Sequence, residues 1–117
     1  MRIDVHFYGG VQLADPGHLG PAPVDRRYGN DAVLEAYENL AHWAQESERH
    51  GFDTMWLTEH HFQHEGYEVV PNLILMGTHL ASQTKHLRFG QAFNVVPQWH
   101  PLRLAADYAL ADILTGG

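Results

Sequence analysis

The hydrophobic positions of the chain form three short apolar runs that alternate with three longer segments of helical spacing. The runs, which are typical of strands, are residues 2–8, 52–58 and 87–96. The segments, in which apolar residues recur three and four positions apart, are residues 30–50, 71–84 and 101–114. Strands that alternate with helices predict parallel pairing through right-handed crossovers, and therefore an α/β fold.

Single residues mark the expected ends of the helices. Asn30 or Asp31 can cap the first helix, and Gly51 can end it in the left-handed conformation. Pro71 is expected to open the second helix, and Pro101 lies near the start of the third. Proline is tolerated there because a first-turn N–H has no helical partner.

The apolar spacing also predicts which side chains are buried. The expected stripes are Leu34, Tyr37, Leu40, Ala41 and Ala44 in the first helix; Leu73, Met76, Gly77 and Leu80 in the second; and Leu102, Ala105, Ala106, Ala109, Leu110 and Ile113 in the third. Trp43 and Trp56 are most simply interpreted as core residues. Residues 9–29, with five glycines and three prolines, predict a long loop that can cover a site.

Three β/α units fit either the opening of a TIM (β/α)₈ barrel or a small doubly wound sheet. A complete barrel takes about 250 residues, whereas this chain has 117. The chain therefore holds less than half of such a barrel.

Composition excludes several classes of protein. The net charge of −7 with neutral histidines argues against nucleic-acid binding. No run of about 18 apolar residues exists, which excludes a membrane-spanning helix, and the N-terminus lacks the layout of a signal peptide. Because the chain has no cysteine, disulfides and cysteine-based zinc sites are excluded, and the cytoplasm is the expected location.

The candidate chemistry gathers directly after the second strand, where Glu59 is followed by His60 and His61. Both histidines can act as general acid or base, because imidazole titrates near neutral pH. Glu59 can fix the tautomer of one imidazole and raise its basicity. The alternative is that these polar residues simply lie in a solvated loop.

A metal site is a second alternative, because His64 and Glu65 add further ligand types to this cluster. The spacing departs from the helical His-Glu-x-x-His arrangement, since His61 occupies the position of its glutamate. We therefore predict no metal.

Two other segments are expected beside this cluster. Tyr8 follows the first strand, and Phe93 and Asn94 lie late in the third. Because ligands bind at the carboxyl ends of the strands in such folds, three unusual segments on one edge indicate a binding site.

Residues 51–62 (GFDTMWLTEHHF) closely resemble the GFD-x-x-W-x-x-EHHF block of the bacterial luciferase-like flavin-dependent monooxygenase family. Residues 87–97 resemble the third strand of that family, and they lead into His100-Pro101-Leu102-Arg103 in the same register. Residues 114–117 look like the family's approach to its fourth strand. The resemblance implies that residues 1–117 are a partial (β/α)₈ barrel domain, truncated after the third helix.

The resemblance also implies a chemistry. Reduced FMN, supplied by a separate flavin reductase, reacts with O₂ and oxygenates a small organic substrate. His60 matches the family's catalytic histidine, and His61 matches a neighbour of more structural role. Ala92 and Phe93 match the pair whose peptide bond backs the flavin ring and is commonly cis. Tyr8 and Asn94, at the neighbouring strand ends, complete the expected cofactor contacts.

Three further expectations accompany the resemblance. The second and third helices match those that pack across the dimer interface in relatives, which implies a homodimer or heterodimer. Phe93 is bulkier than the small residue of luciferase itself, which indicates a substrate other than an aldehyde. Two alternatives remain: a deazaflavin-dependent oxidoreductase of the same superfamily, and a non-catalytic fragment or interaction module.

Overall fold

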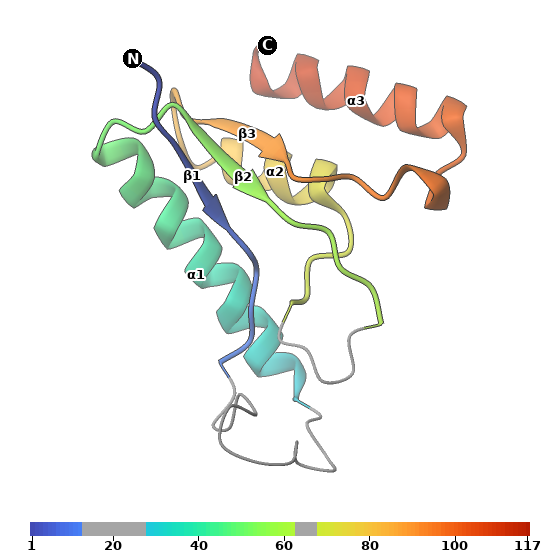
Figure 1. Ribbon diagram of the computed structural model, residues 1–117, viewed down its shortest axis with the longest axis horizontal. Coiled ribbons are helices and arrows are strands. Elements are labelled where there is room, and N and C mark those ends of the chain that lie inside the picture. Colours follow the sequence, from blue (N-terminus) through green and yellow to red (C-terminus); the bar gives the residue numbers. More distant parts are fainter. Residues whose placement is uncertain (13–27, 63–67) are drawn as a thin grey trace.

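The computed structural model describes residues 1–12, 28–62 and 68–117, in which three strands alternate with three α-helices (Figure 1). The elements are β1 (Asp4–Phe7), α1 (Asn30–Arg49), β2 (Thr54–Leu57), α2 (Leu73–Ala81), β3 (Arg88–Gln91), the short 3₁₀ helix η1 (Val96–Gln98) and α3 (Pro101–Thr115). β1 pairs with β2, and β2 with β3, both in parallel. The prediction of an α/β fold with a parallel sheet is confirmed.

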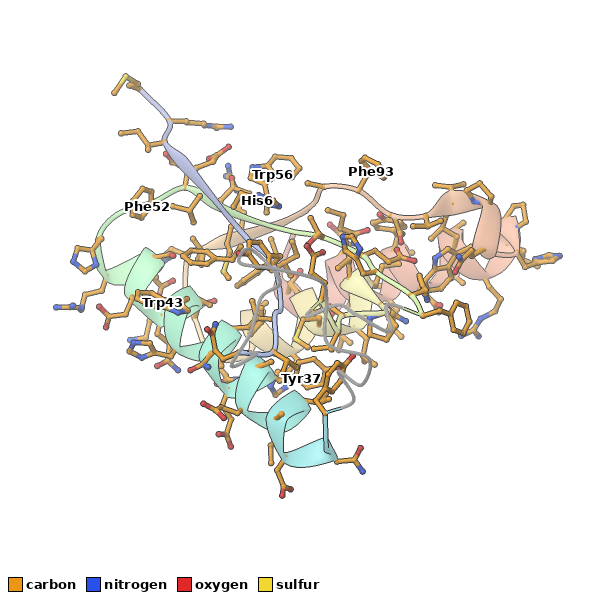
Figure 2. All side chains as sticks on the ribbon, turned by 60° about the horizontal axis from the view of Figure 1, so that its bottom comes forward. His6, Tyr37, Trp43, Phe52, Trp56 and Phe93 are labelled. Atoms are coloured by element: carbon orange, nitrogen blue, oxygen red, sulfur yellow. The ribbon has the colours of Figure 1, made fainter. Side chains whose placement is uncertain are left out.

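The pairing register sorts the strand residues onto two faces. Met55 and Leu57 of β2 are 0% and 1% exposed, whereas Trp56 between them is 38% exposed. Trp56 pairs with His6 of β1 and Gly90 of β3, so these three positions share one face. Figure 2 shows His6 and Trp56 on the side of the sheet away from α1. Among the described elements, the helices cover only the opposite face.

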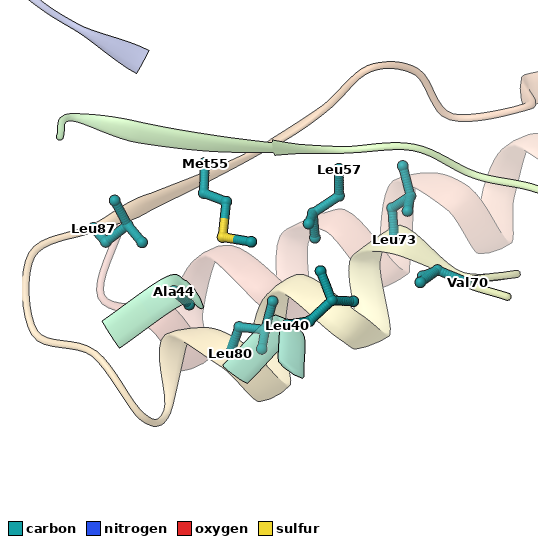
Figure 3. Close-up of a cluster of buried hydrophobic side chains, with 8 residues drawn as sticks. All are labelled: Leu40, Ala44, Met55, Leu57, Val70, Leu73, Leu80 and Leu87. Carbon is teal, nitrogen blue, oxygen red and sulfur yellow. The ribbon is translucent and has the colours of Figure 1, made fainter. Parts of the chain in front are cut away.

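The core lies between the sheet and the helices (Figure 3). Its buried side chains are Leu40, Ala44, Met55, Leu57, Val70, Leu73, Leu80 and Leu87. Gly9, just after β1, lies against this cluster. A Cβ at Gly9 would overlap the side chains of Val70 and Leu40, so only glycine lets the backbone approach α1 this closely.

The two tryptophans expected in the core are both half-exposed, so that prediction was wrong. Trp43 is 47% exposed, and its ring stacks on Phe7 of β1 at a centroid distance of 5.7 Å. Trp56 lies on the sheet face without helices, where its Nε1 donates to Asp4 Oδ2 at 3.1 Å. Its indole covers Gly90, where a Cβ would overlap the ring. Each indole therefore packs against a neighbouring residue of the sheet and is still more than a third exposed.

The ends of the helices differ from the prediction in detail. α1 begins at Asn30 with Gly29 as its N-cap and no side-chain cap, so capping by Asn30 or Asp31 was wrong. Gly51 has φ 78°, which confirms the left-handed terminator. α2 begins at Leu73, and its cap is Asn72 rather than a start at Pro71: Asn72 Oδ1 accepts the N–H of Leu75 at 2.9 Å. A capping side chain decides the first turn more strongly than the proline before it.

The strands end earlier than the apolar runs suggest. The prediction of a strand to residue 96 was wrong, because β3 ends at Gln91 and η1 follows. The N–H of Ala92 donates to the carbonyl of Leu57 at 2.7 Å. β2 ends at Leu57, so beyond that bond β3 has no neighbouring strand residues with which to pair. Apolar runs predict burial, whereas the length of a strand depends on its neighbour.

The buried face of α3 was also predicted wrongly. Leu102, Leu110 and Ile113 are 74%, 55% and 75% exposed. The partly buried positions, Leu104, Asp107 and Ala111, lie on the opposite side of the helix. Alanine residues lie on both sides of α3, so the apolar spacing predicts a helix but does not show which side of it is buried. In α1, Leu34 likewise points outward, whereas the stripe predicted for α2 is buried or partly buried. None of these described helices is long and apolar enough to span a membrane.

Glu48, near the end of α1, fastens the connection between α2 and β3. Its Oε1 accepts the backbone N–H groups of Lys85, His86 and Leu87 at 2.7, 2.5 and 3.0 Å. These bonds hold the pKa of the Glu48 carboxyl below its ordinary value of 4.5, and the bond from His86 has the largest effect. Burial opposes the shift. A lowered pKa means that the ionised carboxylate stabilises the fold.

We expect Glu48→Gln to lower the free energy of unfolding by about 1 kcal/mol at neutral pH, a value discounted for solvent because the carboxylate is only partly buried. The stabilisation is fully present above the unfolded pKa near 4.5 and is lost as the pH falls through the lower folded pKa. Urea denaturation over that pH range, with the exposed Glu38→Gln as control, measures it. A difference between Glu48→Gln and the parent that persists in acid would contradict the assignment.

Candidate functional site

Glu59 lies two residues after the end of β2 and is the buried carboxylate of the site, with a side chain that is 0% exposed. Its Oε1 lies 2.6 Å from Nε2 of His61. Its Oε2 accepts the backbone N–H of Val95 at 3.0 Å. Both oxygens are thus bonded, as a buried carboxylate requires. Glu59 therefore ties the carboxyl end of β2 to the segment that follows β3.

The contact with Glu59 also indicates which ring nitrogen of His61 carries a hydrogen. An imidazole nitrogen that faces a carboxylate oxygen carries a hydrogen, so His61 donates through Nε2. The sequence predicted that Glu59 holds one imidazole, and the structure identifies that imidazole as His61. His61 is 22% exposed at its side chain, so it is held rather than mobile in solvent.

His60 has a carboxylate partner of its own, Glu68. The Nε2 of His60 forms an ion-pair contact with Glu68 Oε2, and the two side chains are 32% and 16% exposed. The hydroxyl of Thr58 lies 3.4 Å from the same oxygen. Sequence reasoning missed Glu68, because it lies eight positions after His60 in a segment without a recognisable motif. The site thus contains two separate Glu–His pairs.

Backbone bonds hold the segment of Glu68 between two strand ends. The N–H of Val69 donates to the carbonyl of Gly9 at 2.8 Å. On the other side, the N–H of His60 donates to the carbonyl of Val70 at 3.1 Å. The ends of β1 and β2 therefore meet through residues 69 and 70, as their parallel pairing predicts.

Tyr37 of α1 is hydrogen-bonded to the segment that contains Glu68 and Val69. Its hydroxyl donates to the carbonyl of Val69 at 2.6 Å. Burial raises the pKa of the Tyr37 hydroxyl above its ordinary value of 10.0, and the nearby Tyr28 adds to the shift. Tyr37 therefore remains a neutral donor under all physiological conditions.

The end of β3 supplies a different surface. The peptide bond between Ala92 and Phe93 is cis, as the resemblance predicts, and Phe93 is 76% exposed. Nδ2 of Asn94 donates to the hydroxyl of Tyr108 at 3.2 Å, and that hydroxyl donates to the side chain of Gln91. Oδ1 of Asn94 is buried and has no hydrogen-bond partner among the described residues. α3 is thereby linked to the end of β3.

The two histidines open onto one pocket of about 520 Å³. His60, His61, Phe62 and Glu68 line it, whereas Glu59 does not. A second pocket of about 680 Å³ lies between α2, β3 and α3, away from both Glu–His pairs. His60, His61 and Glu68 therefore line the first pocket, whereas Glu59 contacts His61 without lining the pocket itself.

The other residues predicted for the site, and the predicted loop at residues 9–29, lie only partly within the described residues. Tyr8 follows β1 with a side chain that is 56% exposed. His64, Glu65 and most of the predicted loop at residues 9–29 lie outside the described residues. In residues 1–12, 28–62 and 68–117, no three histidine, aspartate or glutamate side chains are grouped as a metal ion would require.

Comparison with known proteins connects this site to a family. Residues 13–117 match the family model of the luciferase-like monooxygenases. The oxygenase component of flavin-dependent trigonelline monooxygenase from Acinetobacter baylyi is 35% identical over 83 residues, which cover 71% of this chain and 22% of that protein. The alkanal monooxygenase alpha chain of the Kryptophanaron alfredi symbiont is 39% identical over 83 residues, covering 71% and 23%. The chain thus spans less than a quarter of these relatives.

Solved structures share the fold. The oxygenating constituent of 3,6-diketocamphane monooxygenase from Pseudomonas putida, in complex with FMN, aligns with a TM-score of 0.71 at 22% identity, covering 98% of this chain and 27% of that one. A monooxygenase from Streptomyces bottropensis aligns with a TM-score of 0.72 at 20% identity, covering 98% and 30%. These likenesses show the fold, and the match over residues 13–117 shows the relationship. The chain belongs to the luciferase-like monooxygenase family.

Proposed function

We propose that this chain provides the first three β/α units of a (β/α)₈ barrel that binds reduced FMN and uses O₂ to oxygenate a small organic substrate. The observation that carries this proposal is the pair of Glu–His contacts at the carboxyl end of β2, with Glu59 bonded across to the segment after β3. In barrel enzymes the active site is built from the carboxyl ends of several strands. The FMN complex of the 3,6-diketocamphane enzyme supports the choice of cofactor.

The residues at the end of β3 fit a flavin. Phe93 offers an exposed apolar surface, and the peptide bond between Ala92 and Phe93 is the proposed backing of the ring. Oδ1 of Asn94 is a buried acceptor without a partner in the described chain, and a ring N–H would satisfy it. Tyr8 is the proposed contact from β1. Reduced FMN, when bound, supplies the electrons with which O₂ is activated.

The chain's own acid–base chemistry falls to His60. His60 lines the pocket and is 32% exposed, so it can hold a proton beside a bound substrate and release it. His61 and Glu59 together are proposed to fix the shape of the pocket wall. Glu59 does this from a position that solvent does not reach.

The partners follow from the same proposal. A separate flavin reductase supplies reduced FMN, because one relative is named as an oxygenase component. Trigonelline and alkanals, which appear in the relatives' names, are small organic molecules, so the substrate is expected in that class. The outward apolar side chains of α3, among them Leu102 and Ile113, support a homodimer or heterodimer formed through α2 and α3. The proposed location is the cytoplasm.

Anaerobic titration with reduced FMN, and in parallel with a reduced deazaflavin, tests the proposal. We expect saturable binding of reduced FMN that weakens by up to about tenfold in His60→Ala, the factor that one hydrogen bond contributes. His79→Ala, an exposed histidine on α2, is the matched control and should bind as the parent does.

Two outcomes would overturn the proposal. Preference for the deazaflavin would place the chain among hydride-transferring oxidoreductases. If a cooperatively folded sample bound neither cofactor, the chain would be a non-catalytic fragment or interaction module. The sheet face that lacks helices would then be a surface for another protein segment.

A further inference from the structure

We propose that Glu68 is the positioning residue of His60, and that its carboxylate holds the ring through Nε2. This proposal rests on the proposed function, in which His60 is the acid–base group. The observation behind it is the contact between His60 Nε2 and Glu68 Oε2 at the wall of the pocket. Neither the motif at residues 59–62 nor the pattern of the strands points to Glu68.

Glu59 is adjacent to His60 in sequence, but both of its carboxylate oxygens are bonded to other groups. One of its oxygens lies 2.6 Å from Nε2 of His61, and the other accepts the N–H of Val95 at 3.0 Å. It is also absent from the pocket wall, which both His60 and Glu68 line. Among the described residues, the carboxylate in contact with His60 is therefore that of Glu68.

The backbone holds Glu68 firmly beside His60. Glu68 forms an isolated antiparallel bridge with Gly10, three residues after the end of β1. Beyond it, the carbonyl of Val70 accepts the N–H of His60 itself at 3.1 Å. The hydroxyl of Thr58 reaches the same carboxylate oxygen at 3.4 Å. A positioning group needs such support, because a loosely held partner would not fix the ring.

The consequence for His60 follows from the chemistry of imidazole. A nitrogen that faces a carboxylate must carry a hydrogen, so the contact with Glu68 selects the form of the ring that has a hydrogen on Nε2. Glu68 is only 16% exposed, so its negative charge acts on the ring with little screening by solvent. Of the other titratable groups near this wall, His61 is paired with Glu59, which lies behind the wall, and Tyr28 also lines the pocket.

Nuclear magnetic resonance of histidine side chains tests the contact without any cofactor. In the ¹⁵N-histidine-labelled protein, we expect Nε2 of His60 to carry a downfield proton that exchanges slowly with water, because a carboxylate holds it. In Glu68→Gln this proton should move upfield or disappear, while that of His61 remains. Glu59→Gln is the matched control and should change the His61 signal instead. A His60 signal unchanged in Glu68→Gln, or a proton found on Nδ1 alone, would overturn the proposal.

A double-mutant cycle then separates positioning from simple structural support. The readout is the rate at which O₂ reoxidises bound reduced FMN. We expect Glu68→Gln to change this rate about tenfold in the parent protein, as partners of functional imidazoles do, and to have no further effect in His60→Ala. An equal effect in both backgrounds would overturn the proposal. Failure of reduced FMN to bind would instead refute the proposed function, and the resonance of His60 would still decide the role of Glu68.

Discussion

Glu59→Ala is expected to lower the free energy of unfolding by about 2–3 kcal/mol, because it removes a buried carboxylate and leaves two partly buried hydrogen-bond donors without partners. Those donors are Nε2 of His61 and the backbone N–H of Val95. The substitution removes one member of a buried pair, which costs more than replacing both members. The hydrogen bond from the N–H of Ala92 to the carbonyl of Leu57 would remain between the end of β2 and the segment after β3. Urea denaturation of parent and variant measures the loss.

Two further variants separate the causes of this effect. Glu59→Gln keeps the shape and one acceptor, so an intermediate loss would show that both the charge and the hydrogen bonds contribute. Glu38→Ala removes an exposed glutamate of α1 and should change stability by less than about 0.5 kcal/mol. If Glu59→Ala were as neutral as Glu38→Ala, the buried contacts at the end of β2 would not be formed in solution.

The sequence predicts this site unevenly, and the reason is the range of each interaction. Glu59, His60 and His61 are recognisable because they follow a strand of apolar residues directly. Which carboxylate holds which imidazole is not recognisable, because Glu68 reaches His60 only after the chain has turned back beside β1. A contact that forms only when the chain folds back on itself leaves no pattern in the local sequence. Motif reading therefore locates a strand-end site but not its pairings.

The fold shows the same limit. The stripe predicted for α2 is buried or partly buried, although the helix also carries Leu75, which is 70% exposed. α3 has the correct period, yet Leu102 and Ile113 point outward. Trp56 fails for another reason: the alternation of β2 places it on the face opposite Met55 and Leu57, and strand alternation outweighs hydrophobicity. Local spacing predicts the elements, whereas the pairing register decides what each residue contacts.

Leu80→Ala is expected to lower the free energy of unfolding by about 3 kcal/mol or more, the range measured for leucines removed from well-packed cores. Leu80 is 0% exposed and belongs to the cluster between α2 and the sheet. Such a loss is large for a small domain, whose total stability is about 5–15 kcal/mol. Thermal or urea denaturation followed by circular dichroism measures it.

Leu75→Ala is the matched control, because it makes the same change in the same helix at a residue that is 70% exposed. Alanine and leucine have similar helix propensities, so the control should change stability by less than about 0.5 kcal/mol. The difference between the two variants thus isolates burial from any effect on the helix itself. Equal losses would mean that α2 does not pack on the sheet through Leu80. The segment that carries Glu68 leads directly into α2, so the support proposed for His60 would then fall as well.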